Sequence, residues 1–123
     1  MALHRTQVKR SLFLALMVCG LPLRALPARQ STRYTVTAYC HCARCCGRAN
    51  QPTGSGRTPL AGLTVAGPRS VPYGTRVFIE GIGIRTVQDR LAGRFEDRFD
   101  VYVGTHHAAQ KFGLRHLQVT VLP

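Results

Sequence analysis

The chain has 123 residues, a length that suits one domain, and it carries 17 Lys and Arg residues against 5 Asp and Glu, for a formal net charge of +12. Aromatic residues make up only 7% and Trp is absent, so the sequence does not supply the rows of aromatic side chains on which many nucleic-acid-binding proteins stack bases. All five side-chain carboxylates fall between Glu80 and Asp100, which excludes carboxylate chemistry elsewhere in the chain.

The first 28 residues have the order of a secretory signal peptide. Basic side chains precede a mainly apolar run over residues 12–23, which is too short to span a membrane comfortably. We expect cleavage after Ala28, with a lipid on Cys19 as the alternative. Removing residues 1–28 leaves 13 basic and 5 acidic residues, a net charge of +8. The expected protein is therefore exported to the periplasm, outer membrane or cell wall, with a domain over residues 29–123 whose basic surface attracts anions.

Residues 33–39 alternate β-branched or aromatic residues with others, which predicts a strand that leads directly into four cysteines. In an exported protein we expect these cysteines to form two disulfides, and geometry favours crossing pairs. The cysteines lie within seven residues, at Cys40, Cys42, Cys45 and Cys46, and the favoured pairs are 40 with 45 and 42 with 46.

A zinc site is the alternative to the disulfides, and a reactive redox thiol is the third interpretation. Zinc would be bound by the four cysteines, or by three of them and one of the histidines His41, His106 and His107. We expect His106 and His107 to be solvated residues at the start of a helix rather than ligands. No other cofactor is expected.

The rest of the chain alternates loops with short strands. Residues 47–64 are rich in Gly, Pro, Ser and Thr and predict a long irregular loop, a length usually reserved for function. Thr105 is expected to cap a short helix through Phe112, which Gly113 ends. Further strands are predicted over residues 75–80, 84–89, 98–104 and 116–122. Five or six short strands without crossover helices indicate a small, mainly β barrel.

Two carboxylates, Asp89 and Asp100, each lie in a strand-like run, and a polar loop that contains glycine separates them. A pair of strands would aim both side chains at one groove. We expect Glu96 and Asp97 to be solvated residues at the tip of the hairpin loop between those strands.

Five segments together resemble the three-aspartate (3D) domain family. The likeness covers nearly all of residues 34–122 in order, through "TVTAYCHCARCCG", "GPRSVPYGTRVFIEGIG", "TVQDRL", "RFDVYVG" and "AAQKFGLRHLQVTVL". The resemblance implies a mainly β fold, a small six-stranded double-psi β-barrel with one short helix near the C-terminus. It also implies a relation to the catalytic barrel of membrane-bound lytic transglycosylase A.

By this resemblance Asp100 matches the catalytic acid/base and Asp89 matches its partner in the groove. The implied activity is cleavage of peptidoglycan glycan strands, in which the C6 hydroxyl of muramic acid attacks the anomeric carbon. Two departures stand out. The first family aspartate is Gly67 here, and the usual Asp-Thr-Gly-Gly segment is "DRLAG", which puts Arg90 and Leu91 beside the groove.

Three further residues are candidates for substrate binding. Arg98 shares a strand face with Asp100, so it either stabilises the charged form of that carboxyl or binds substrate carboxylates. Tyr39 and Tyr73 are candidates to stack on sugar rings, with core or turn packing as the alternative.

The expected partner is peptidoglycan, bound by a monomer that associates with the membrane through the envelope; nucleic acid is not expected. Two alternatives remain open: a non-catalytic glycan-binding barrel and, on basic charge alone, a nucleic-acid-binding domain.

Overall fold

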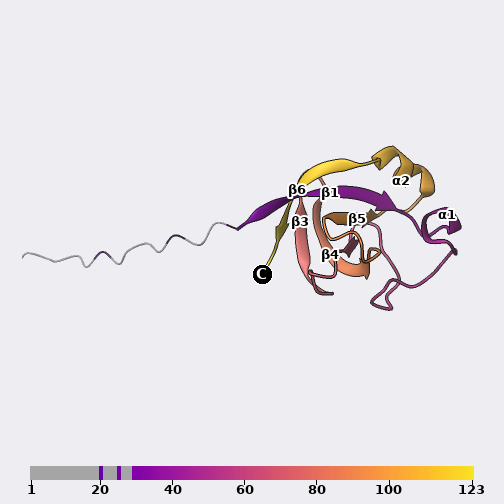
Figure 1. Ribbon diagram of the computed structural model, residues 1–123, viewed down its shortest axis with the longest axis horizontal. Coiled ribbons are helices and arrows are strands. Elements are labelled where there is room, and N and C mark those ends of the chain that lie inside the picture. The colour runs from indigo at the N-terminus through magenta and orange to yellow at the C-terminus, as the bar shows by residue number, and fades with distance from the viewer. Residues whose placement is uncertain (1–19, 21–24, 26–28) are drawn as a thin grey trace, which may run out of the picture.

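Six strands and two short helices make up the described part of the chain (Figure 1). The computed structural model describes residues 29–123 together with Gly20 and Ala25, so the predicted signal peptide and the alternative lipid site at Cys19 otherwise lie outside the described residues. Among the described residues, no helix has the length and apolar character needed to cross a membrane. In chain order the elements are β1 (Ser31–Tyr39), α1 (Ala43–Cys46), β2 (Thr64–Gly67), β3 (Arg76–Ile79), β4 (Gly83–Arg90), β5 (Arg98–Tyr102), α2 (His106–Phe112) and β6 (Arg115–Val121).

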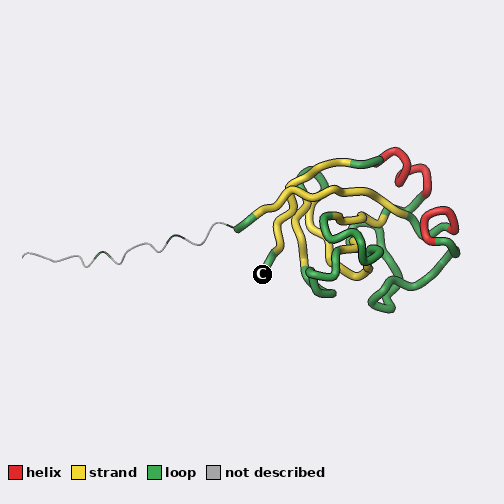
Figure 2. Tube along the Cα trace, viewed as in Figure 1, coloured by secondary structure: helices red, strands yellow, loops and turns green. Residues whose placement is uncertain are grey.

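The strands close into a barrel in the order β1-β5-β2-β4-β3-β6. The pairs β1 with β5 and β2 with β4 are parallel, and the other neighbours are antiparallel. Closure leaves no unpaired edge strand. Both helices lie at the end of the barrel where β1 ends (Figure 2). The predicted fold class, a mainly β six-stranded double-psi barrel with a short helix near the C-terminus, is confirmed, and α1 is a second helix that the sequence analysis did not predict.

Every strand contributes to one apolar core inside the barrel. Most of the side chains are β-branched, a type that packs well on a pleated surface. The buried members are Val36, Val65, Val71, Val77, Ile79, Val87, Phe99, Val101 and Val119. Side chains alternate along β5: Phe99 and Val101 face the core, and Asp100 between them faces the other way.

The caps of α2 agree with the sequence prediction. The Thr105 hydroxyl accepts a hydrogen bond from the backbone N–H of Ala108 at 3.1 Å, which satisfies one of the free donors of the first turn. Gly113 ends the helix at φ 65°, a backbone conformation that costs glycine little. The predicted helix from its cap at Thr105 to Phe112 is therefore confirmed.

The strand β2 was missed by the sequence analysis, which ended its long loop at residue 64. All four of its residues are buried, because it runs through the barrel wall between β4 and β5. The predicted loop is otherwise present from residue 47 to residue 63. As a consequence, β2 lies between the two strands that carry Asp89 and Asp100.

Candidate active site

Asp89 and Asp100 both lie opposite Ala66 of β2. Ala66 is in register with Asp89 across the parallel β2–β4 ladder and with Asp100 across the antiparallel β2–β5 ladder. Neighbouring strands are about 4.8 Å apart, so two strand spacings separate the aspartate backbones by about 10 Å. All three residues line the same pocket. The structure thus brings the two predicted aspartates to one groove.

A β-bulge gives Asp89 this orientation. Val65 is in register with Val87, but the next residue, Ala66, is in register with Asp89, so the ladder skips Gln88. In a regular strand Asp89 would lie on the same face as Val87, which is in the core. The extra residue re-aims the side chain, as bulges near functional sites commonly do.

Three donors hold the Asp89 carboxylate. Its Oδ1 accepts hydrogen bonds from the backbone N–H groups of Gly54 and Arg90, both at 2.8 Å. Its Oδ2 accepts one from the Tyr39 hydroxyl at 2.7 Å. Burial, with the adjacent Asp89 as a second cause, raises the pKa of Tyr39 above its usual value, so the phenol remains a donor. Asp89 is therefore fixed in position by β1, by its own strand and by the long loop.

Asp100 has a different environment. Burial in the pocket raises the pKa of Asp100 from 3.8 to about 6, and the nearby charge of Asp89 acts in the same direction. A hydrogen bond that Thr37 donates to its Oδ1 at 3.0 Å and the Arg98 guanidinium both oppose the increase in pKa. Burial outweighs them, so a substantial fraction of Asp100 is protonated near pH 6.

The pocket that contains both aspartates has a volume of about 310 Å³. Arg98 lines it, with its guanidinium carbon 4.3 Å from the centre of the Phe95 ring, which also lines it. The Arg98 Nε is buried and has no hydrogen-bond partner among the described residues. The full lining is Tyr39, Cys45, Cys46, Ala66, Asp89, Arg90, Leu91, Ala92, Phe95, Arg98 and Asp100.

Tyr73, the other predicted sugar-stacking residue, lies outside this pocket. It lines a separate one with Ser55 and Arg57. The Arg90 guanidinium carbon lies 4.0 Å from the centre of the Tyr73 ring. The structure therefore places Tyr39, but not Tyr73, at the aspartate pocket.

The departure at Arg90 from the family pattern has a structural role. The Arg90 guanidinium donates hydrogen bonds to the backbone carbonyls of Pro68 at 3.0 Å and Val71 at 2.6 Å. These bonds, together with the stacking on Tyr73, tie the side chain to the turn after β2. Arg90 therefore contributes to the wall of the pocket while its charged group is held by that turn.

Position 67 faces the core and not the groove. A Cβ atom on Gly67 would lie 3.1 Å from Cγ1 of Val87 and 3.2 Å from Cε1 of Phe99. Both neighbours belong to the core, and the preceding residue, Ala66, points to the pocket. A carboxylate at position 67 of this chain would thus not join Asp89 and Asp100.

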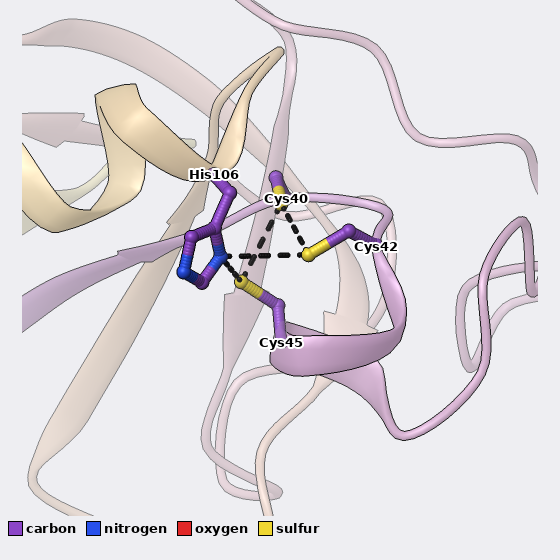
Figure 3. Close-up of side chains that lie close together, drawn as sticks. All are labelled: Cys40, Cys42, Cys45 and His106. Carbon is purple, nitrogen blue, oxygen red and sulfur yellow. Dashed lines mark hydrogen bonds between the residues drawn. The ribbon is translucent and has the colours of Figure 1, made fainter.

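The cysteines gather at the end of the barrel where β1 ends, beside α2 (Figure 3). The Cys40 sulfur lies 3.1 Å from that of Cys42 and 3.5 Å from that of Cys45. The Nδ1 atom of His106 lies 3.4 Å from the sulfurs of both Cys42 and Cys45. The four ligand atoms all lie within 4.8 Å of one another, so this cluster could hold a metal ion.

This geometry bears on two sequence predictions, the role of His106 and the disulfide pairing of the cysteines. The expectation that His106 is merely a solvated residue is wrong, because its ring is directed at two of the sulfurs. All four cysteines are free thiols here, so the expected disulfide pairs are not shown. His107 is exposed, as expected, and the Nε2 atom of His41 instead contacts the backbone carbonyl of Gln51.

The thiols of the cluster differ in acidity. The hydrogen bond from Cys40 is the largest factor that lowers the pKa of Cys42 below the usual thiol range. Burial raises the pKa of Cys40 and of Cys46. Cys42 therefore becomes a thiolate, the form that attacks electrophiles and binds metals, more readily than Cys40 or Cys46.

Comparisons with known proteins support the fold. No protein-family model matches the chain, and no curated protein matches it. A search of solved structures finds the crystal structure of MltA from E. coli, with a TM-score of 0.51 and 20% sequence identity, over 61% of this chain and 28% of that chain. The protein thus contains an MltA-like barrel and spans about 28% of the length of MltA. At this identity the likeness is one of fold.

Proposed function

We propose that this protein is an exported enzyme that cleaves the glycan strands of peptidoglycan by lytic transglycosylation, with Asp100 as the general acid and then the general base. The observation that carries the proposal is the pair of unlike aspartates in one pocket: Asp89 is held by three donors, and burial raises the pKa of Asp100 to about 6. Paired titratable groups in different environments are typical of acid/base catalysis. The MltA-like barrel and the sequence resemblance both support this class.

In the first step, protonated Asp100 donates its proton to the glycosidic oxygen as the bond from that oxygen to the anomeric carbon breaks. Thr37 engages Oδ1 of Asp100, which leaves Oδ2 to carry the proton. Positive charge develops on the sugar ring. Asp89, opposite the same alanine, supplies negative charge to stabilise it.

In the second step, the resulting Asp100 carboxylate takes a proton from the C6 hydroxyl of muramic acid. The C6 oxygen attacks the anomeric carbon and closes a 1,6-anhydro ring, which returns Asp100 to its protonated form. Most glycosidases need a second carboxylate to activate water or to form a covalent intermediate. An internal nucleophile replaces that function and can contribute about 7 kcal/mol or more, while a positioned acid/base adds roughly 10²- to 10⁴-fold.

Arg98 is proposed to bind the substrate. It lines the pocket beside Asp100, and its guanidinium is close enough to act on the pKa of that carboxyl. Carboxylates of the peptide stem or of the lactyl group are suitable acceptors, because a guanidinium pairs well with a carboxylate. The excess of basic residues over acidic ones favours the same anionic polymer.

The proposed location is the cell envelope, in the periplasm, at the outer membrane or in the cell wall. It rests on the signal-like order of residues 1–28 and on the nature of the substrate. We propose that the protein acts there as a monomer.

The test compares purified full-length protein with two variants on isolated sacculi. Asp100→Asn removes the proton donor and should reduce the release of soluble muropeptides by roughly 10²-fold or more. Glu96→Gln removes an exposed carboxylate from the loop between β4 and β5 and should leave release unchanged. Co-sedimentation of all three proteins with sacculi, without release by any of them, would instead identify a non-catalytic glycan-binding barrel.

A further inference from the structure

A second cluster of reactive side chains lies beside the aspartate pocket and plays no part in the chemistry proposed for it. Three sulfurs come from the segment that follows β1, and one imidazole comes from the start of α2, 64 residues away from Cys42 in sequence. Figure 3 shows the Nδ1 atom of His106 directed at the sulfurs of Cys42 and Cys45, both of which also lie close to the Cys40 sulfur. Two segments far apart in the chain thus converge on one point.

The spacing of these atoms suits a single tetrahedral ion. With Zn–S bonds of about 2.3 Å and a Zn–N bond of about 2.0 Å, the edges of the tetrahedron are roughly 3.5 to 3.8 Å. The observed edges are 3.1 Å and 3.5 Å between sulfurs and 3.4 Å from Nδ1 to each of two sulfurs. Ion binding would lengthen the shortest edge, between the sulfurs of Cys40 and Cys42, by about 0.7 Å, and the remaining ligand pairs already lie within 4.8 Å of each other.

The donor set selects the type of metal. Thiolate and imidazole are ligands that zinc prefers, whereas calcium and magnesium prefer oxygen. Four protein ligands fill the tetrahedron and leave no open position for water or substrate, which is the arrangement of structural zinc sites.

The fourth cysteine is not part of this set. The Cys46 thiol donates a hydrogen bond to the backbone carbonyl of Cys40 at 3.2 Å, and Cys46 lines the aspartate pocket. The structure therefore favours a site of three cysteines and one histidine over a site of four cysteines, and substitution of Cys46 separates the two.

The helix that carries Cys45 has little stability of its own. This helix, α1, has four residues, no side-chain cap and no buried residue. A helix of this length is not stable on its own, and tertiary packing usually supplies the missing stability. A bound ion would supply it here by joining α1 to the start of α2.

We propose that Cys40, Cys42, Cys45 and His106 bind one Zn²⁺ in a closed structural site that fixes the wall of the aspartate pocket. Two features connect the site to that wall. Cys45 lines the pocket itself, and Cys40 directly follows Tyr39, whose hydroxyl holds Asp89. The ion thus helps to set the position of Tyr39, which holds Asp89.

The test measures zinc directly, so it does not depend on glycan cleavage. Full-length protein is produced in zinc-supplemented medium, purified with a reductant, and its metal content is measured by inductively coupled plasma mass spectrometry. We expect one zinc per chain in the wild type. His106→Asn and Cys42→Ser should lose the zinc, while the neighbouring controls His107→Asn and Cys46→Ser should retain it.

Two further measurements use only the wild-type protein, so they test the proposal even if a variant fails to fold. Cobalt(II) added to metal-free wild type should give the visible absorption of a tetrahedral thiolate site, and one equivalent of zinc should abolish it. Chelation should lower the thermal midpoint of the wild type. Wild-type protein that takes up neither ion would overturn the proposal. So would mass spectrometry that finds every copy of these cysteines in disulfides after purification without reductant. Retention of zinc by folded His106→Asn, or its loss from folded Cys46→Ser, would overturn this ligand set.

Discussion

Asp89 and Asp100 approach the same residue, Ala66, from the two strands that flank it. The strand of Asp89 runs parallel to β2 and that of Asp100 antiparallel. Regular alternation directs Asp100 to the pocket, whereas Asp89 reaches the pocket side only through the bulge at Gln88. Their surroundings then separate their roles. Three donors hold Asp89. Asp100 accepts a hydrogen bond from Thr37, and burial is the largest influence on its pKa.

The raised pKa of Asp100 predicts how stability depends on pH. A carboxyl with a pKa of 3.8 when unfolded and about 6 when folded favours the folded state fully below pH 3.8, and this contribution is lost as the pH rises through 6. Relative to Asp100→Asn, the wild type should therefore lose about 3 kcal/mol of stability between pH 3.8 and pH 8. Urea unfolding of both proteins across this window measures the difference. A constant difference would contradict the raised pKa.

Arg98 and Arg94 form a matched pair for testing the electrostatics. Each guanidinium stacks on the Phe95 ring, but only Arg98 lines the pocket. Because the Arg98 charge opposes the raised pKa of Asp100, Arg98→Gln should raise this pKa further and shift the alkaline limb of the activity profile to higher pH. It should also raise KM for glycan fragments. Arg94→Gln should change neither quantity, and equal effects of the two variants would contradict a specific role for Arg98.

The hydrogen bond from Tyr39 to Asp89 predicts a cost for removing one hydroxyl. Tyr39→Phe leaves Oδ2 of Asp89 without this donor and should lower the free energy of unfolding by about 1–3 kcal/mol. It should also reduce the rate of sacculus digestion, because Asp89 is less firmly placed. Denaturant titration and muropeptide release are the measurements. Tyr34→Phe, at a ring that packs edge-on against Phe99 in the core, is the control.

The orientation of Gly67 predicts that introducing an aspartate at this position does not increase activity. Gly67→Asp forces a carboxylate against Val87 and Phe99 and should destabilise the barrel by about 2–5 kcal/mol, without a gain in activity. Gly93→Asp, on an exposed loop where the atoms nearest to an added Cβ belong to the Arg69 side chain at 3.6 Å or more, should cost little. Thermal unfolding of both variants checks this. A stable and more active Gly67→Asp protein would mean that position 67 faces the groove.

Local sequence signals predicted much of the barrel. Alternation along residues 33–39 predicted β1, the strand-like run over residues 98–104 predicted β5, which ends two residues earlier, and the caps Thr105 and Gly113 bounded α2 correctly. The strand β2 has no such signal. It has only four residues, and all of them are buried, so it shows no alternation.

The parts of the site that depend on long-range geometry could not be predicted in the same way. Alternation alone would have put Asp89 on the core side with Val87, and the bulge that re-aims it depends on pairing with β2. His106 joins the cysteines only because β5 leads α2 back beside the end of β1. The sequence suggested a metal site as an alternative and included His106 among its possible ligands, but it could not select that histidine.

The identity of the cleavage product tests the central claim most directly. Isolated sacculi digested by the full-length protein in ¹⁸O-labelled water should yield muropeptides that end in 1,6-anhydromuramic acid and carry no label, because the attacking oxygen comes from the sugar itself. Reducing ends that carry one ¹⁸O atom would show that water is the nucleophile and would contradict transglycosylation by Asp100.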